Sequence, residues 1–518
     1  MPRNDNNNTG GAGKTRAAGS RIPGAGSGRG RTSETGKAGT DPAGKISETG
    51  KAGTDPAAKI SEAEKAGTDP AGKTGRAGET GRATSPATVI LKKGKEQSIR
   101  RYHPWIFSGA ISSVSGNPKE GDVAEIYAWD KTYLATGHWA PGSIAVRILS
   151  FEKCSIDREF FRKRLADAFR YRINSGIAGR SDTNVWRLVH GEGDGLPGLV
   201  VDIYGSVAVL QAHTAGFWHI RQMIADQIPE VTGGLVTAVY DKSEGTLPFM
   251  AKLNPVNGYL AGGPGGDPSG GLIGDLSGGP AGDPSDGLTG DLSGGLTGDP
   301  SGSLAGKGTV VTENGFKFRI DWEKGQKTGF FIDQRDSRSL LRQYSNGKRV
   351  LNMFGYTGGF SVYAMSNASL VHTVDSSAAA TALADENINL NFGDDPRHRS
   401  FTADAFGFLS GMDREYDLII LDPPAFAKHQ TALNQALQGY RRLNAMAIQK
   451  IKPGGILFTF SCSQVVSRDD FRRSVFVAAA NTGRNVRILH QTGQTADHPV
   501  NIYHPESEYL KGLVLYIE

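Results

Sequence analysis

The sequence is poor in cysteine, with two in 518 residues, and it contains no apolar run long enough to span a membrane. Two thiols far apart in the chain form neither a disulfide framework nor a recognisable metal-ligand spacing, so no metal is expected. The first residues, MPRNDNNNTG, lack the apolar stretch of a signal peptide. We therefore expect a cytoplasmic protein that does not associate with membranes.

Neither sign of charge predominates, since 58 Lys and Arg stand against 53 Asp and Glu and the formal net charge is only +5. Residues 1–86 carry an excess of Lys and Arg, whereas residues 257–308 carry an excess of Asp. Outside these tracts, basic residues cluster in 91–101 and 162–172. Such clusters can contact phosphate, but a mildly basic surface is more often only a solvated one.

Large apolar residues are nearly absent from two repetitive tracts. Within residues 1–86, a 14-residue unit beginning SETGKAGTDPAGK recurs through 33–73. Residues 257–308 repeat an eight-residue unit, which differs from the nine-residue unit of calcium-binding β-rolls. Neither tract can bury enough apolar surface to offset the entropy of ordering, so both are predicted to be disordered.

The remaining residues predict three domains. Short apolar runs separated by Gly and Pro in 87–155 indicate a small β-rich domain. A helix from Asp157 (REFFRKRLADAFRYRI), a pair of strands around a Gly/Pro turn and a second helix indicate an α+β central domain, 156–256. Strands then alternate with helices through 309–518, which is typical of an α/β domain with a doubly wound, Rossmann-like parallel sheet. Its last two strands would add an antiparallel edge.

Small and acidic residues follow the first three strands of this predicted sheet. Gly355, Gly358 and Gly359 follow the first strand, while Asp375 ends the second and Asp404 the third. Ligands of open α/β sheets bind beyond these strand ends, where glycine admits a nucleotide-like ligand and a carboxylate accepts ribose hydroxyls. NAD enzymes, nucleotide binders and methyltransferases share this pattern. A capping role is the alternative for Asp404.

The fourth and fifth strands end in LDPP and FTFSCS. Because these strands are expected to be neighbours, Asp422 and Cys462 should face one site. A buried cysteine is most often a small apolar residue. The small polar neighbours Ser461, Ser463 and Gln464 instead favour a nucleophilic thiol.

Six motifs carry a family resemblance: NMFGYTGGFSVYA, VDSSAAATALADENINLN, LDPPAFAK, FTFSCS, KTGFFIDQRDSR and TADHPV. Taken in the order in which they occur along the chain, they resemble the family of large-subunit (23S) ribosomal RNA cytosine-5 methyltransferase I. RRYHPWIFSGAI is similar to that family's N-terminal PUA RNA-binding domain, and GEGDGLPGLVVDIYG to its central domain. The resemblance covers about 88–518 apart from the repeat tract. One departure is Ala425, which stands where the family usually has lysine.

The resemblance implies S-adenosylmethionine as cofactor, ribosomal RNA as substrate, and a chain that is compatible with a homodimer. It implies that Cys462 attacks carbon 6 of a cytosine so that carbon 5 accepts the methyl group, while Asp422 holds or protonates the ring. The implied cofactor contacts are Gln334, Asn352, Phe354, Gly355, Tyr356, Thr357, Gly358, Gly359, Asp375, Asp404 and Asp422. The implied RNA contacts are Arg100, Arg101, His103, Trp105, Pro423 and Pro424.

Three other functions remain open from the residues alone. An exocyclic-amine RNA methyltransferase would use LDPP but needs no thiol. A non-catalytic PUA-type RNA-binding protein would have no need of the glycine, aspartate and cysteine pattern. A nicotinamide-dependent oxidoreductase would leave both LDPP and Cys462 without a role.

Overall fold

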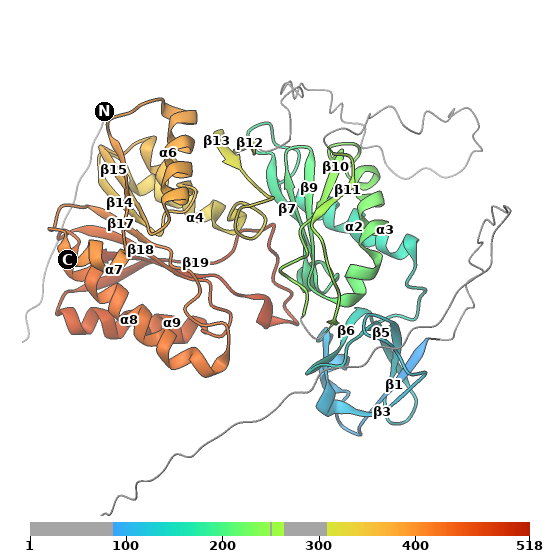
Figure 1. The fold of residues 1–518 in the computed structure, drawn as a ribbon. Coiled ribbons are helices and arrows are strands. Elements are labelled where there is room, and N and C mark those ends of the chain that lie inside the picture. Colours follow the sequence, from blue (N-terminus) through green and yellow to red (C-terminus); the bar gives the residue numbers. More distant parts are fainter. Residues whose placement is uncertain (1–85, 249–250, 264–307) are drawn as a thin grey trace, which may run out of the picture. The chain divides into compact units, whose positions relative to one another are not determined.

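Three large sheets organise the part of the chain that the structure, a computed structural model, describes: residues 86–248, 251–263 and 308–518 (Figure 1). The predicted disorder of 1–86 and of most of 257–308 lies outside these ranges. None of the described helices combines the length and apolarity needed to cross a bilayer.

The first sheet confirms the small β-rich domain. Its strands lie in the order β2-β6-β5-β4-β1-β3, with β1 parallel to β4 and the other pairs antiparallel. Alternate residues of β1 are buried, as the period of a strand requires. The elements are β1 (Ala87–Leu91), α1 (Gln97–Arg100), β2 (Trp105–Phe107), β3 (Ile111–Ser115), β4 (Val123–Tyr127), β5 (Tyr133–Trp139) and β6 (Ile144–Ser150).

The second sheet has the order β11-β10-β9-β8-β7 and packs against two helices. The helix predicted from Asp157 is confirmed, because that carboxylate accepts a hydrogen bond from Phe160 N (3.0 Å) and caps the helix. The predicted pair of strands is wrong, since this segment forms three. The elements are α2 (Arg158–Asn174), β7 (Val185–His190), β8 (Leu199–Tyr204), β9 (Val207–Ala212), α3 (Ala215–Val231), β10 (Ala238–Asp241) and β11 (Gly258–Ala261).

Strand β11 corrects the predicted start of the second repetitive tract. It was expected to be disordered, yet it pairs antiparallel with β10. Tyr259 packs its ring on Tyr240, with centroids 5.1 Å apart, and Leu260 contacts the core of the second sheet. The side chain of Asn257 also donates to Glu244 (2.9 Å). These apolar contacts precede the glycine-rich repeat, so the repeat pattern placed the boundary too early.

The third sheet is the predicted Rossmann-like sheet, in the order β16-β15-β14-β17-β18-β20-β19. Five strands are parallel, and β20 and β19 form the expected antiparallel edge. The strands are β14 (Arg349–Met353), β15 (Leu370–Asp375), β16 (His398–Thr402), β17 (Leu418–Leu421), β18 (Gly455–Ser461), β19 (Val486–Thr492) and β20 (Lys511–Ile517). A hairpin of β12 (Thr309–Glu313) and β13 (Phe316–Ile320) precedes it.

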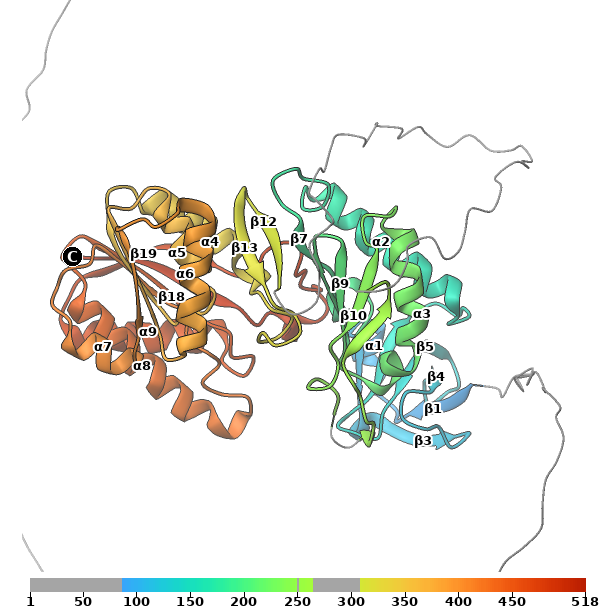
Figure 2. The ribbon, with the colours of Figure 1, turned by 45° about the horizontal axis from the view of Figure 1, so that its top comes forward.

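Helices cover both faces of this sheet (Figure 2). Val350 of β14 packs with α4, α5 and α6, whereas its neighbour Leu351 packs with α7, α8 and α9. Successive strand residues point to opposite faces, so a strand buried on both sides is apolar throughout. The helices are α4 (Arg335–Tyr344), α5 (Gly359–Met365), α6 (Ala378–Phe392), α7 (Ala405–Gly411), α8 (Leu433–Lys450) and α9 (Arg468–Thr482).

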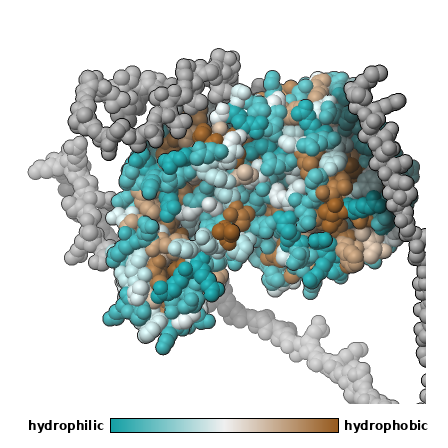
Figure 3. Space-filling view, turned by 180° about the vertical axis from the view of Figure 1, so that it is seen from behind, coloured by the Kyte–Doolittle hydropathy of each residue, from teal (hydrophilic) through white to brown (hydrophobic). Residues whose placement is uncertain are grey.

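Hydrophilic residues dominate the surface seen from behind, with brown apolar patches between them (Figure 3). Among the exposed large apolar residues, Phe476 lies on α9, whereas Val256 and Ile502 lie in two separate loops. Scattered apolar residues of this kind are normal on a folded protein. The organised apolar side chains therefore lie within the layers described above.

A buried cross-strand ion pair stabilises the second sheet. Arg187 on β7 and Asp202 on β8 are register partners, and the guanidinium donates to both carboxylate oxygens (2.7 and 2.9 Å). The Asp202 side chain is fully buried. Its charge therefore depends on this arginine and on the hydroxyl of Thr328, which donates to it at 2.6 Å.

We expect Arg187→Met to lower the free energy of unfolding by about 3–5 kcal/mol, because it leaves a buried carboxylate without its cation. Urea denaturation followed by circular dichroism measures this loss. Arg349→Met is the matched control, since the Arg349–Glu415 pair is more than one-third exposed and should contribute only about 0–1 kcal/mol. Equal losses in the two variants would contradict the assigned role of burial.

Candidate active site

Parallel pairing brings the predicted site residues to one edge of the third sheet. The strands β14, β15, β17 and β18 run in the same direction, so the residues that follow them share an edge. Asp375 is the last residue of β15, and Asp422 and Cys462 come directly after β17 and β18. The predicted adjacency of Asp422 and Cys462 is confirmed by the pairing of β17 with β18.

The loop after β14 has an unusual backbone. Phe354 and Tyr356 have positive φ angles (61° and 44°), which side chains with a Cβ rarely adopt. A Cβ on Gly355 would lie 2.3 Å from the Thr373 side chain, so the loop approaches β15 too closely for any other residue. Strain of this kind persists only where the surroundings fix it, and it clusters at ligand sites.

Asp375 is one of the groups that fix this loop. Its carboxylate accepts hydrogen bonds from the backbone N–H of Tyr356 (3.0 Å) and of Ser377 (2.9 Å). The end of β15 therefore holds the loop that follows β14. Asp375 remains half-buried, so a carboxylate edge faces the strand-end region.

Three other residues predicted to contact the cofactor form hydrogen bonds within the protein. Asn352 is buried and donates to Ser361 Oγ (2.9 Å), and the backbone carbonyl of Thr357 accepts from Asn387 (2.9 Å). Asp404 is exposed and caps α7 by accepting from Gly407 N (2.8 Å), which was the alternative interpretation. Direct cofactor contacts by these residues remain predictions.

Asp422 and Cys462 lie in a desolvated environment. The Cys462 thiol contacts the carbonyl of Pro423 (3.9 Å), and Gln334 donates to Asp422 (3.1 Å). Burial and the nearby Asp333 carboxylate raise the pKa of Asp422 to about 7. Burial and Asp422 raise the pKa of Cys462 to about 11. Near neutral pH, Cys462 is therefore a thiol beside a carboxyl group that is close to half-protonated.

Lys327 and Asp333 complete the electrostatics of the site, and sequence reasoning assigned them no role. The Lys327 ammonium lies 3.7 Å from Asp333 and lowers the pKa of both Asp422 and Cys462. Burial disfavours the ionised form of Asp333, but Lys327, His498 and a hydrogen bond from Tyr509 (2.6 Å) outweigh it and lower its pKa to about 2. Both residues lie in the motif KTGFFIDQRDSR, and its first residue, Lys327, was the sequence feature that could have indicated a charged group at the site.

Lys511 on β20 is a buried amine that the sequence analysis did not identify. Its ammonium donates to the carbonyls of Ser463 and Tyr509, both at 2.7 Å. Burial lowers the pKa of Lys511 to about 8, although a Cys462 thiolate would raise it. An amine with this pKa is already partly neutral when the thiol begins to ionise.

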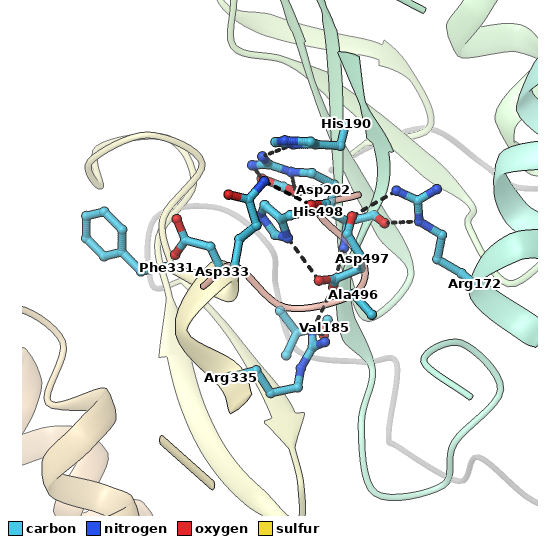
Figure 4. A network of polar contacts seen from close by, with 12 residues as sticks. Arg172, Val185, His190, Asp202, Phe331, Asp333, Arg335, Ala496, Asp497 and His498 are labelled. Atoms are coloured by element: carbon cyan, nitrogen blue, oxygen red, sulfur yellow. Dashed lines mark hydrogen bonds and ion pairs between the residues drawn. The ribbon is translucent and has the colours of Figure 1, made fainter. Parts of the chain in front are cut away.

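A buried cluster of charges joins the site to the second sheet (Figure 4). The fully buried carboxylate of Asp497 accepts from Arg335 (3.0 Å), from the backbone of Arg187 (3.1 Å) and from His498 (2.9 Å). Burial opposes the charge of Asp497, yet Arg335 outweighs it and lowers the pKa. Because Arg335 follows Gln334, this cluster fixes the segment that contacts Asp422.

Comparisons with known proteins match this architecture. A family model described as S-adenosylmethionine-dependent methyltransferase matches residues 297–497, and a PUA-like domain model matches 89–151. The protein named ribosomal RNA large subunit methyltransferase I from Vibrio vulnificus (strain YJ016) is 35% identical over 433 residues, which are 82% of this chain and 98% of the relative. The namesake from Klebsiella pneumoniae (strain 342) is 36% identical over 430 residues, with 82% and 96% covered.

The chain belongs to the ribosomal RNA large subunit methyltransferase I family. The predicted resemblance is confirmed, and so is the class of enzyme, a methyltransferase that uses S-adenosylmethionine. Two solved structures share the fold. One is a putative S-adenosylmethionine-dependent methyltransferase from Streptococcus mutans (TM-score 0.63, 20% identity), and one is a putative methyltransferase complexed with SAH (TM-score 0.64, 21% identity). Each match covers 83% of this chain and 99% of the other.

The strand-end residues of this methyltransferase fit its cofactor. The side-chain oxygens Gln334 Oε1 and Asn352 Oδ1 are buried acceptors without a hydrogen-bond partner in the structure. Buried acceptors of this kind need donors, which the amino and hydroxyl groups of S-adenosylmethionine offer. The glycine at 355 allows the close backbone approach described above.

The residues predicted to contact RNA have different environments. Arg100 and Arg101 are exposed at the end of α1. The indole of Trp105 donates to Glu192 (2.8 Å), and His103 lies 3.5 Å from Glu506, so both already contact other side chains. Pro423, whose carbonyl contacts the Cys462 thiol, is buried, whereas Pro424 is exposed. RNA contacts by all six residues remain predictions.

The electrostatics predict how Cys462 reacts with alkylating reagents. In a Cys154→Ser background, which removes the exposed second thiol, iodoacetamide labelling of Cys462 should rise with pH towards a midpoint near its pKa of about 11. Asp422→Asn removes a neighbouring negative charge, so it should lower this pKa and speed labelling at pH 8. Lys327→Met should slow labelling. An unchanged pH profile in both variants would contradict the assigned charge couplings.

Asp375→Ala should weaken S-adenosylmethionine binding by about 1.5–3 kcal/mol, the range for a charged hydrogen bond. The substitution also frees the Tyr356 N–H, so it loosens the strained loop. Isothermal calorimetry measures the dissociation constant. Asp385→Ala is the control, because this exposed acid on α6 bonds only Ser400 among the hydrogen bonds described. Equal affinities in the two variants would reject the role of Asp375.

Proposed function

We propose that this methyltransferase adds a methyl group to carbon 5 of a cytosine in large-subunit ribosomal RNA, with Cys462 as the covalent nucleophile. The observation that carries the proposal is the placement of Cys462 beside Asp422, at the ends of adjacent strands. The class of RNA comes from the names of the relatives. A cytoplasmic location and a homodimer remain predictions.

The chemistry of cytosine explains why a thiol is needed. Carbon 5 becomes nucleophilic when a bond forms between Sγ of Cys462 and carbon 6 of the ring. The thiol passes its proton to water in this step, the C5=C6 electrons form a C4=C5 double bond, and the C4=N3 electrons move to N3, which takes up a proton. S-adenosylmethionine supplies the methyl group that carbon 5 then takes up. Loss of the carbon-5 proton and cleavage of the S–C6 bond return the free cysteine.

Asp422 is suited to the proton transfer that accompanies the attack. With a pKa of about 7, a large fraction of this side chain carries a proton near neutral pH. It can donate that proton to N3 as negative charge develops there, which is effective general-acid catalysis because the pKa matches the working pH. An ordinary aspartate would be ionised and could only accept hydrogen bonds.

The high pKa of the free thiol is compatible with this role. Thiolate formation in the resting site is opposed by burial and by Asp422, so the sulfur stays protonated until substrate is in place. Lys327 is the cation that lowers the pKa of Cys462 and so favours the thiolate. A proton on Asp422 removes the nearest negative charge, so the protonated acid and the thiolate favour each other.

Features of the first sheet support RNA contact. Arg100 and Arg101 are exposed, and exposed guanidinium groups can pair with phosphate. A hollow of about 500 Å³ lies nearby and is lined partly by aromatic rings, among them Tyr102, Phe151 and Tyr503. Aromatic faces stack on unpaired bases, and the reacting base must leave its stack to reach a buried thiol.

The mechanism predicts the behaviour of Cys462→Ser. Serine preserves size but is a poor nucleophile at neutral pH, so turnover should fall by several orders of magnitude while S-adenosylmethionine binding stays normal. Cys154→Ser is the matched control and should retain activity. RNA containing 5-fluorocytidine should trap a covalent adduct in wild type, because fluorine cannot leave carbon 5 as a proton.

Mass spectrometry of digested adduct and of methylated RNA separates the alternatives. An adduct that maps to residue 462 and a product identified as 5-methylcytidine are the expected results. An active Cys462→Ser enzyme, or an adduct at Cys154, would refute the mechanism. Methylation of the exocyclic amine would support the alternative in which LDPP acts without the thiol.

A further inference from the structure

Two histidines and a glutamate from distant parts of the sequence converge outside the active site. His103 precedes β2 in the first sheet, whereas His504 and Glu506 lie between β19 and β20. Their nearest nitrogen and carboxylate atoms all lie within 4.8 Å of one another. Nε2 of His103 is 3.5 Å from one oxygen of Glu506, and Nε2 of His504 is 3.7 Å from the other.

We propose that His103, His504 and Glu506 bind a divalent transition-metal cation, with Zn²⁺ as the best match. Zinc bonds to histidine nitrogen and carboxylate oxygen are about 2.0–2.2 Å long, so ligand atoms around a tetrahedral ion lie roughly 3.3 Å apart. The two N···O separations, 3.5 and 3.7 Å, run to different oxygens of Glu506, and the ligand atoms all lie within 4.8 Å of one another. The side chains therefore have to close by up to about 1.5 Å to hold the ion.

The imidazole of His504 is the strongest indication of a missing partner. The residue is 1% exposed, and Nε2 has no hydrogen-bond partner. Its contact with Glu506 at 3.7 Å is too long for a hydrogen bond. A buried polar atom without a partner is costly, and a metal ion would use its lone pair.

In each ring Nδ1 has a neighbouring acceptor, and donation to that acceptor would leave Nε2 free for coordination. Nδ1 of His504 lies 3.1 Å from Ser507 Oγ and can donate to it. Nδ1 of His103 lies 3.3 Å from the carbonyl of Trp105 and 3.2 Å from the backbone N–H of the same residue. Metal binding through Nε2 requires the tautomer in which Nδ1 carries the proton and donates to that carbonyl. Metal-binding histidines usually donate their second ring nitrogen to such an acceptor, which fixes the tautomer.

The surroundings also suit a cation. Glu506 is partly exposed, so water can reach the site and fill a fourth position. Glu192, whose carboxylate accepts a hydrogen bond from the Trp105 indole (2.8 Å), and Glu506 are two acids close to the rings of His103 and His504. The sequence analysis expected no metal from the spacing of the two cysteines, and residues 103 and 504 are too far apart in the chain to form a recognisable motif.

The site would fasten the β19–β20 segment to the first sheet through the residues predicted to touch RNA. The ring of Trp105 lies 4.2 Å from that of His504, so occupancy should change tryptophan fluorescence. The proposal is independent of the cytosine chemistry, since none of its ligands lies at the strand ends of the third sheet.

The test uses the full chain carrying Cys154→Ser, treated with EDTA and dialysed, then titrated with Zn²⁺. Calorimetry should show one equivalent of Zn²⁺ bound, and the melting temperature should rise, because the ion binds the folded state. Co²⁺ should give the visible absorption of a tetrahedral site. His504→Phe and Glu506→Gln should each lose at least ten-fold in affinity, whereas His219→Phe, an exposed histidine of α3, should bind normally.

Glu506→Gln guards against misfolding, because this half-exposed side chain is replaced by one of equal size. Retention of full Zn²⁺ affinity in both His504→Phe and Glu506→Gln would overturn the proposal. Absence of Zn²⁺ binding by the parent chain would overturn it as well. Parallel loss in the two variants, with a normal His219→Phe, would establish the site.

Discussion

The arrangement of the active site depends on the hydrogen bonds of one buried carboxylate, that of Asp497. It accepts hydrogen bonds from Arg335 in α4 and from the backbone of Arg187 in β7, and its own carbonyl accepts from Arg172 (2.8 Å) in α2. A buried charge is tolerated only when several donors surround it. These donors come from separate elements, so Asp497 holds the second sheet and α4 in one position. Gln334 is thereby fixed against Asp422.

The second constraint is that the site tolerates little negative charge. Asp333 is ionised, stabilised by Lys327 and Tyr509, and its charge raises the pKa of Asp422. Asp422 in turn raises the pKa of Cys462. The three acidic groups are therefore ordered: one is always charged, one titrates near neutrality, and one stays protonated. This order places a carboxyl group that titrates near neutrality beside a protonated thiol at adjacent strand ends.

Much of the fold could be predicted because helical and strand periods are local. The apolar runs that gave β14, β17 and β18 also gave their strand-end residues, since parallel neighbours end at one edge. Position 404 shows the limit: an aspartate after a strand can cap a helix or bind a ligand, and the sequence contains both patterns. Lys327 and Lys511 were not identified because their proximity to Cys462 depends on segments far from it in sequence. Tyr259 shows that a repeat does not define where an ordered strand ends.

The segment between β19 and β20 connects these features. It contributes Asp497 and His498 to the buried cluster, Tyr509 to the acid beside Lys327, and His504 and Glu506 to the contact with the first sheet. The thirteen residues from 497 to 509 thus contact Arg187 of the second sheet, His103 next to the first sheet, and Asp333 beside the candidate active site. A shift of this segment would change the donors of Asp333 as well as the contact at His103. The first sheet and the ionisation of the active-site acids are therefore linked by one short stretch of backbone.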